Sequence, residues 1–212
     1  YNFKINKTKQ PLKNMKTKLA LSLIFAVASA NAATISFSNF DSGSFAGLVI
    51  VDSSNNSLGL TSTAEVGYFS DEALAAAGDF TTWNSFGSVA NFGAGFSIPG
   101  LYSGDASAST AGASPFIGQS ITTLITSASG SEYLVAKSDQ TFGQDNPLFT
   151  ATVNIYSDSG ITYLFGGTAG SSVDFGTGPQ SSIQTAAVPE PSAYALLGGL
   201  FALTCVMLRR RA

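Results

Sequence analysis

Apolar and polar residues alternate in short stretches between residues 33 and 188. Over 149–155, Phe, Ala, Val and Ile alternate with Thr and Asn, which is typical of a strand with one buried face. A second apolar run at 161–165 follows an Asp-Ser-Gly turn, so the two runs are predicted to pair as a β-hairpin. Residues 88–118 are rich in Gly, Ala and Ser and are expected to form long loops. Further strands are predicted at 34–37, 48–51, 64–69, 121–126, 132–136 and 173–175.

Short strands separated by polar turns predict a mainly β fold, an antiparallel β-sandwich-like domain spanning residues 33–185. One or two short helices interrupt it. Residues 71–78 place acidic residues first, alanines in the middle and glycine last, which predicts a short helix.

A cluster of aromatic residues follows this helix. Asp79 is expected to cap a further turn that places Phe80, Trp83 and Phe86 on one side, because they are three residues apart. Such a trio either seals one end of the β fold or contacts a sugar, and sealing is the favoured interpretation. Trp83 is the candidate glycan contact in the second case.

The N-terminal segment 15–32, MKTKLALSLIFAVASANA, has lysines first, then an apolar stretch, then small residues at Ala30 and Ala32. This order predicts a secretory signal peptide, exported by the Sec translocon and cut by signal peptidase after Ala32. A buried core helix is the alternative, but it does not account for the Ala-Asn-Ala end. Residues 1–14 precede a natural start at Met15 and are interpreted as a non-native extension.

An uncharged run at 192–208 is just long enough to cross a hydrocarbon core of about 30 Å. It is apolar all round, whereas a helix of a soluble core usually has a polar face. Three basic residues close the run: Arg209, Arg210 and Arg211. Because basic flanks stay in the cytoplasm, both ends of the chain are expected inside and the domain between them outside.

The residues just before this run are Val188, Pro189, Glu190 and Pro191. Proline fixes φ and keeps the residue before it out of the α region, so an extended, accessible peptide is expected at the outer membrane face.

In this order, motif, apolar run and arginine cluster resemble the PEP-CTERM sorting signal of Gram-negative, polysaccharide-secreting bacteria, over residues 186–212. The resemblance implies that exosortase, a membrane-embedded cysteine-peptidase-like enzyme, recognises 189–191, with 209–211 as the stop-transfer cluster. The protein would be anchored in the inner membrane before the tail is removed, and would then reach the cell surface or extracellular matrix.

Basic residues are nearly confined to the two ends of the chain. Between residues 33 and 188, Lys137 is the only basic residue against 12 acidic ones, a formal charge of -11. Such a surface repels nucleic acids and anionic lipids, so neither is an expected partner of the domain. Its carboxylates offer oxygen ligands to divalent cations, but scattered surface carboxylates are usually just solvated.

Composition also limits the possible chemistry. The chain has no histidine, and its one cysteine, Cys205, lies in the C-terminal apolar run. This excludes histidine-dependent nucleophiles, histidine-containing zinc sites and intrachain disulfides. The polar run 52–56 lacks the Gly and terminal Glu of an EF-hand loop, the run 139–146 is similarly incomplete, and both are predicted as turns. A carboxylate pair for glycoside hydrolysis stays open, and the available glutamates are Glu65, Glu72 and Glu132.

These observations favour an exported, non-catalytic protein with a structural or adhesive role in the envelope or extracellular matrix. No cofactor, metal site or catalytic residue is assigned. A carbohydrate-binding module that meets extracellular polysaccharide through Trp83 is the alternative, and a glycan-active hydrolase is less favoured.

Overall fold

The computed structural model describes residues 32–41, 46–87, 89–93, 97–110, 114–144, 149–174, 178–188 and 200. The expected signal peptide up to residue 31 and the tail segments 189–199 and 201–212 lie outside the described residues. Within the described part, no helix has both the length and the apolar character that a membrane span requires.

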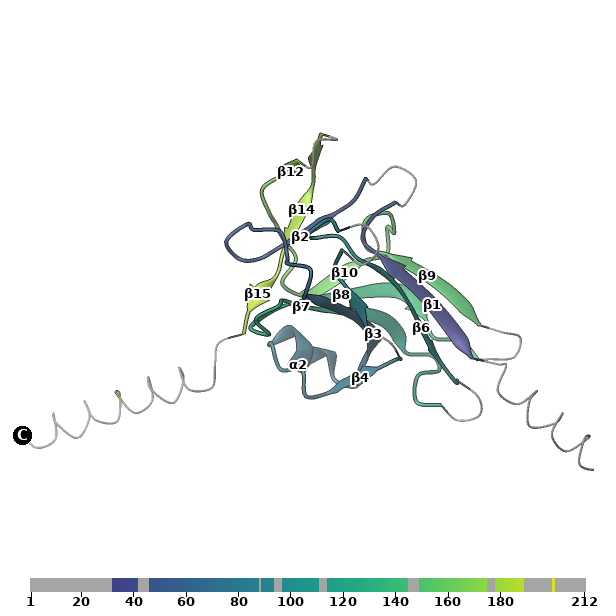
Figure 1. The fold of residues 1–212 in the computed structure, drawn as a ribbon. Helices are drawn as coiled ribbons and strands as arrows, with labels where there is room; N and C mark the ends of the chain where they lie inside the picture. The colour runs from purple at the N-terminus through teal and green to yellow at the C-terminus, as the bar shows by residue number, and fades with distance from the viewer. Residues whose placement is uncertain are drawn as a thin grey trace, which may run out of the picture.

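The described chain is mainly β, with mostly antiparallel sheets. Apart from the single residue 200, the helical residues of the described part all belong to α2 (Glu72–Ala76). The strands, drawn in Figure 1, are β1 (Ala33–Ser38), β2 (Val49–Val51), β3 (Thr63–Phe69), β4 (Trp83–Ser85), β5 (Ala90–Asn91), β6 (Ser103–Ala108), β7 (Ser120–Thr126), β8 (Glu132–Thr141), β9 (Thr150–Asn154), β10 (Thr162–Phe165), β11 (Thr168–Ala169), β12 (Val173–Asp174), β13 (Pro179–Gln180), β14 (Ser182–Gln184) and β15 (Ala186–Ala187).

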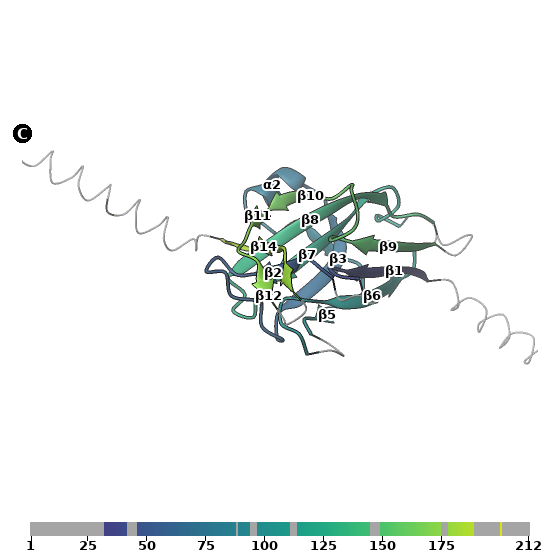
Figure 2. The same cartoon turned by 90° about the horizontal axis from the view of Figure 1, so that it is seen from above.

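Two sheets form the body and share one core. The larger has the order β10-β8-β7-β3-β4, with β15 added to β8 and β5 to β3; the smaller has the order β6-β1-β9. Side chains from both sheets meet in a single buried cluster that includes Ile35, Phe37, Val66 and Ile125. A further sheet, β11-β14-β2, and the pair β12-β13 stand at one end of the body (Figure 2). Among the strands of the described residues, two pairs are parallel, β1 with β9 and β2 with β14.

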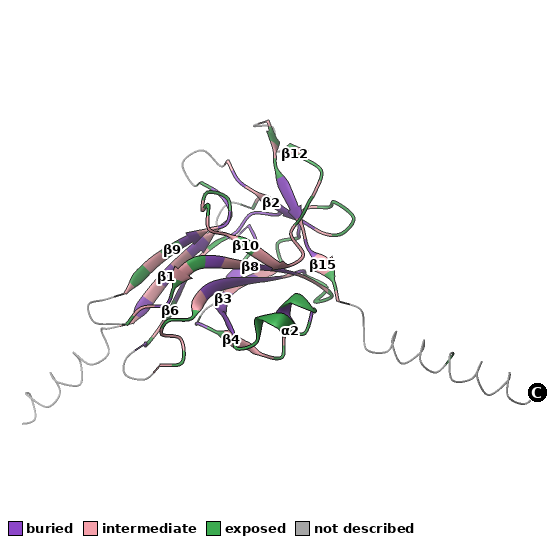
Figure 3. Cartoon of the chain, turned by 180° about the vertical axis from the view of Figure 1, so that it is seen from behind, coloured by how far each residue is buried: buried purple, intermediate pink, exposed green. Residues whose placement is uncertain are grey.

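Strand β1 shows how alternation selects the core face. Ile35 and Phe37 are at most 1% exposed and point into the cluster, while Ser36 and Ser38 point outward. Figure 3 shows the same alternation of burial along the neighbouring strands. The predicted strand is therefore confirmed, one residue longer at each end.

The opposite face of the larger sheet is covered by α2 and the turn after it. A second cluster joins Ala75 of the helix to Phe69, Leu124 and Val135 of the sheet. Asp71 caps the helix, since its side chain accepts from the amides of residues 73 and 74. The chain leaves through Gly78 at φ 84°, a left-handed conformation that glycine adopts at little cost. The predicted short helix is confirmed.

The predicted hairpin of 149–155 with 161–165 is wrong. Both strands exist, but β9 pairs with β1 in the smaller sheet and β10 pairs with β8 in the larger one. The turn between them is closed on Asn154, whose backbone amide donates to Asp158 Oδ2 at 2.8 Å and whose carbonyl accepts from the Asp158 amide at 2.9 Å. This turn carries the chain from one sheet to the other instead of back along β9.

The predicted grouping of Phe80, Trp83 and Phe86 on one side holds for Phe80 and Trp83 but is wrong for Phe86. Phe86 is fully buried in the main core, where its ring centroid lies 4.8 Å from that of Phe142. Phe80 and Trp83 instead pack over Phe69 on the outer face of the larger sheet. The chain is extended from Trp83 onward in β4, so the odd spacing between Trp83 and Phe86 points these two side chains to opposite faces.

Residues 88–118 contain more strand than expected, because β5 and the six-residue β6 lie within this predicted loop region. The inward positions of β6 are small: a Cβ at Gly104 would meet Ala90 and Phe37. Side chains of the neighbouring strands, Phe37 of β1 and Ala90 of β5, thus fill the space over the inward face of β6. A strand without large apolar residues of its own leaves little periodic signal.

Gly67 on β3 provides a test of the packing on the outer face. A Cβ there would collide with the carbonyl oxygen of Asn84 and lie 2.8 Å from Trp83 Cζ2. We expect Gly67→Ala to lower the free energy of unfolding by about 1 to 3 kcal/mol. Urea denaturation followed by the fluorescence of Trp83, the only tryptophan, measures this.

Gly59→Ala is the matched control, because a Cβ at Gly59 meets no atom within 4 Å. Its expected change is within about 0.5 kcal/mol. Equal stabilities of the two variants would contradict the close approach of Trp83 to β3.

Candidate functional site

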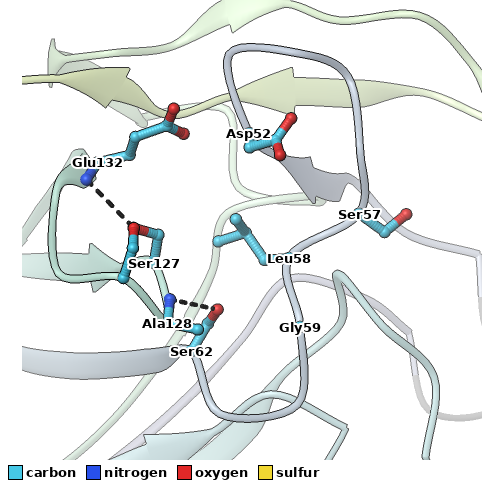
Figure 4. A pocket seen from close by; sticks show the side chains of 9 residues that line it. Asp52, Ser57, Leu58, Gly59, Ser62, Ser127, Ala128 and Glu132 are labelled. Carbon is cyan, nitrogen blue, oxygen red and sulfur yellow. Dashed lines mark hydrogen bonds between the residues drawn. The ribbon is translucent and has the colours of Figure 1, made fainter.

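An open hollow of about 250 Å³ lies where the β7–β8 turn approaches the chain after β2, and is called here the acidic hollow. It contains two carboxylates, Asp52 just after β2 and Glu132 at the start of β8, which Figure 4 shows above Leu58. The other lining residues are Ser57, Gly59, Ser62, Ser127, Ala128 and Ser129. The Glu132 amide donates to Ser127 Oγ and the Ala128 amide to Ser62 Oγ, each at 3.1 Å.

Glu132 joins three segments that are distant in sequence. Its carboxylate accepts from Ser53 Oγ at 2.5 Å, from the Ser53 amide at 3.1 Å and from Thr185 Oγ1 at 2.6 Å. Burial by itself raises the pKa of the Glu132 carboxyl, but the hydrogen bonds from Ser53 and Thr185 outweigh it, and the pKa is lowered overall. Glu132 is therefore ionised at neutral pH and serves as a cross-link.

Asp52 closes the turn that follows β2. Its Oδ1 accepts from the amides of Ser54 and Asn56, each at 2.8 Å, and its Oδ2 accepts from Asn56 Nδ2 at 3.0 Å. Burial raises its pKa, but the bonds from Asn56 and Ser54 lower it by more. The turn predicted at 52–56 is confirmed. The turn predicted at 139–146 is wrong in its first part, because residues 139–141 belong to β8.

The three glutamates considered for glycoside hydrolysis have separate roles. Glu65 accepts from Trp83 Nε1 at 3.3 Å, and Glu72 forms an ion pair with Lys137 at 2.7 Å. Glu132 instead shares the acidic hollow with Asp52. A glycosidase needs one carboxyl group of raised pKa as its acid, and both members of this pair have lowered values. Within the described ranges, no three acidic, cysteine or histidine residues cluster as metal ligands.

Trp83, the candidate glycan contact, is half-buried. Its ring centroid lies 4.8 Å from that of Phe69, and its Nε1 donates to Glu65. The exposed aromatic residue missed from the sequence is Tyr156, which is 44% exposed in the turn after β9. The sequence indicated this exposure, because Tyr156 lies between a predicted strand and an Asp-Ser-Gly turn.

The centre of the main core holds a buried tyrosine. The ring of Tyr102 packs against Phe37 and Phe92. Burial, with a smaller contribution from Tyr163, raises the pKa of Tyr102. This hydroxyl is neutral and fully enclosed, so it is part of the core and not of a surface site.

Of the residues predicted to form a sorting motif, the structure describes only Val188. Its amide donates to the Ser131 carbonyl at 3.2 Å, directly after β15 has paired with the start of β8. Ala32, the expected cleavage position, directly precedes β1. The remaining predicted motif residues lie outside the described part, namely Ala30, Pro189, Glu190, Pro191, Arg209, Arg210 and Arg211.

No family model, curated protein or solved structure matches the chain.

The acidic hollow predicts a dependence of stability on pH. Folding lowers the pKa values of Asp52 and Glu132 below 3.8 and 4.5, so both carboxylates stabilise the fold above these values. Their contribution is lost as the pH falls through the lowered values. We expect Glu132→Gln to cost about 1 to 3 kcal/mol at pH 7 and to weaken this loss, because the amide cannot replace both accepting oxygens.

Urea titrations between pH 7 and pH 3 measure both effects. Glu72→Gln is the control, because Glu72 is 45% exposed and its ion pair is expected to contribute less than about 1 kcal/mol. A Glu132→Gln variant as stable as the parent at pH 7 would refute the cross-link.

Proposed function

We propose that the protein is an exported, sandwich-like domain with a non-catalytic, structural or adhesive role in the cell envelope or extracellular matrix. It is delivered by an N-terminal signal peptide and a cleavable C-terminal sorting tail with a membrane-spanning helix. The observation that carries this proposal is the position of the fold within the chain. Strand β1 begins at Ala33, directly after the expected signal cleavage, and β15 ends at Ala187, just before the Pro-Glu-Pro motif.

The junction with the tail also supports sorting. Pairing of β15 with β8 holds the chain on the sheet up to Val188. A hollow of about 390 Å³ beside this point is lined by Val188, Phe80 and Tyr133, among others. The proline-containing peptide follows at once in the sequence, which supports a processing enzyme that meets the tail just beyond the sheet.

The charge of the domain supports an extracellular role without nucleic acid or anionic lipid as partner. Lys137, the only basic residue between positions 33 and 188, is engaged by both carboxylate oxygens of Glu72 at 2.7 Å. The domain thus presents acidic and neutral groups to its surroundings, and electrostatic repulsion disfavours polyanions.

Sorting is tested by mass spectrometry of the C-terminus of the protein isolated from its native host. We expect a wild-type protein that ends near the Pro-Glu-Pro motif and lacks the arginine cluster. A triple variant, Pro189→Ala, Glu190→Ala and Pro191→Ala, should keep the full tail, because its extended recognition peptide is lost.

Pro179→Ala on β13, an exposed position, is the matched control and should be processed normally. An intact, arginine-terminated tail on the wild-type protein would contradict sorting and indicate a permanent membrane anchor.

A further inference from the structure

The outer face of the smaller sheet carries only short polar side chains. Strand registers arrange them in three rows across β6, β1 and β9, which together are called here the polar face. The rows are Ser107–Thr34–Thr150, Asp105–Ser36–Thr152 and Ser103–Ser38–Asn154. Neighbouring strands are about 4.8 Å apart and residues on one face repeat about every 7 Å, so the polar face is a regular grid of donors and acceptors.

Bonds between side chains order this grid. Thr34 Oγ1 and Ser107 Oγ share a hydrogen bond of 3.1 Å, and Ser36 Oγ donates to Asp105 Oδ1 at 2.6 Å. A hydroxyl has one donor and two acceptor positions, so bonds within a row leave capacity for a ligand. The polar side chains of β6 and two on β9 are exposed, while those of β1 are half-buried between them.

A hollow of about 470 Å³ lies at the end of the polar face, within the size range of small-ligand sites. Ser38, Ser103, Thr152 and Asn154 line it from the sheet, and the rest of its lining is Phe40, Asp41, Tyr156 and Ser157. The Tyr156 amide donates to Asn154 Oδ1 at 3.0 Å, and Asn154 Nδ2 donates to the Phe40 carbonyl at 3.1 Å. The backbone under Tyr156 is thus fixed while its ring is exposed.

This combination specifies the chemistry of a ligand. A sugar ring has an apolar C–H face that stacks on an aromatic ring, and a rim of hydroxyls that bonds to hydroxyl, amide and carboxylate groups. The three rows contain no basic residue and include Asp105, and Asp41 lies in the hollow, so polyanions are repelled. An uncharged polysaccharide offers the apolar ring faces and the hydroxyls that this surface can bind, and it has no negative charge to be repelled.

We propose that the polar face and Tyr156 bind an uncharged polysaccharide chain, with one sugar unit in the hollow and its neighbours along the rows. This inference rests on the function proposed above, because export is what would bring the domain into contact with the polymer. It identifies the polymer as the adhesive partner in that function. It places the contact on the smaller sheet, on the far side of the core from Trp83.

Other candidates on the described surface fit a ligand less well. In the acidic hollow, local donors already occupy oxygens of both Asp52 and Glu132. Trp83 packs on Phe69 and lies against Gly67, so part of its ring is covered. Tyr156 instead combines an exposed ring with a hollow of its own.

The test is affinity gel electrophoresis of the full-length protein in mild detergent, with dextran, galactomannan or mixed-linkage β-glucan in the gel. We expect retardation by at least one of these neutral polymers and none by alginate, an anionic polymer. Tyr156→Ala should weaken the affinity about tenfold through the lost stacking. Thr152→Arg, which places a large side chain across the middle row, should weaken it as well.

Trp83→Phe is the matched control and should bind like the parent. Melting curves of all variants exclude unfolding as the cause of a loss, and if Tyr156→Ala does not fold, Thr152→Arg decides. Absence of retardation by all three neutral polymers, or retardation that survives both substitutions, overturns the proposal. Retardation lost only in Trp83→Phe would place the site on the larger sheet and also overturn it.

The outcome is independent of processing. A tail that stays intact in the host would defeat the proposed sorting but leave binding of the purified protein unchanged. Conversely, normal processing with no polymer binding would defeat this inference alone.

Discussion

The contact between the inner faces of the two main sheets determines most of the remaining structure. Ile35 and Phe37 of β1 meet Val66 of β3 and Ile125 of β7, and each is at most 1% exposed. Burying such a side chain contributes about 1.5 to 3 kcal/mol. Because side chains on a strand alternate, a slip of one residue would expose this set and bury the serines between them. The same constraint that forms the core therefore also fixes which residues form the polar face.

Carboxylates in this domain act mainly as acceptors that connect segments of the chain. Asp71 caps a helix, Asp52 closes a turn, and Glu132 links the turn after β2 to the residue that precedes β15. A chain without disulfides or histidines can use such bonds to fix its loops. The strong negative charge is thus partly a by-product of loop structure. The polar face remains as the large regular surface where neutral groups predominate.

Local patterns in the sequence predicted where strands and helices lie better than they predicted which strands pair with each other. Period-2 alternation located β9, strand-like runs located β1, β3 and β7, and the Asp-to-Gly span located α2. The partner of β9 could not be derived in this way, because its neighbour β1 lies more than 100 residues earlier in the chain. The same limit applied to the candidate sites. Glu132 was visible as a glutamate, but its bonds to Ser53 and Thr185 depend on the sheets being assembled. Phe86 was placed on the wrong face because a helical spacing from Trp83 was assumed where the chain is extended.

The parallel pairing of β2 with β14 constrains the order in which the domain can form. Residues 49–51 are all buried and apolar, and one of their neighbours in the sheet is residues 182–184. A chain that emerges with its N-terminus first must keep this edge unsatisfied until nearly the last strand has followed. Contacts this distant in sequence are slow to form and expose apolar edges while they wait. The domain therefore completes its fold only when its C-terminal end arrives.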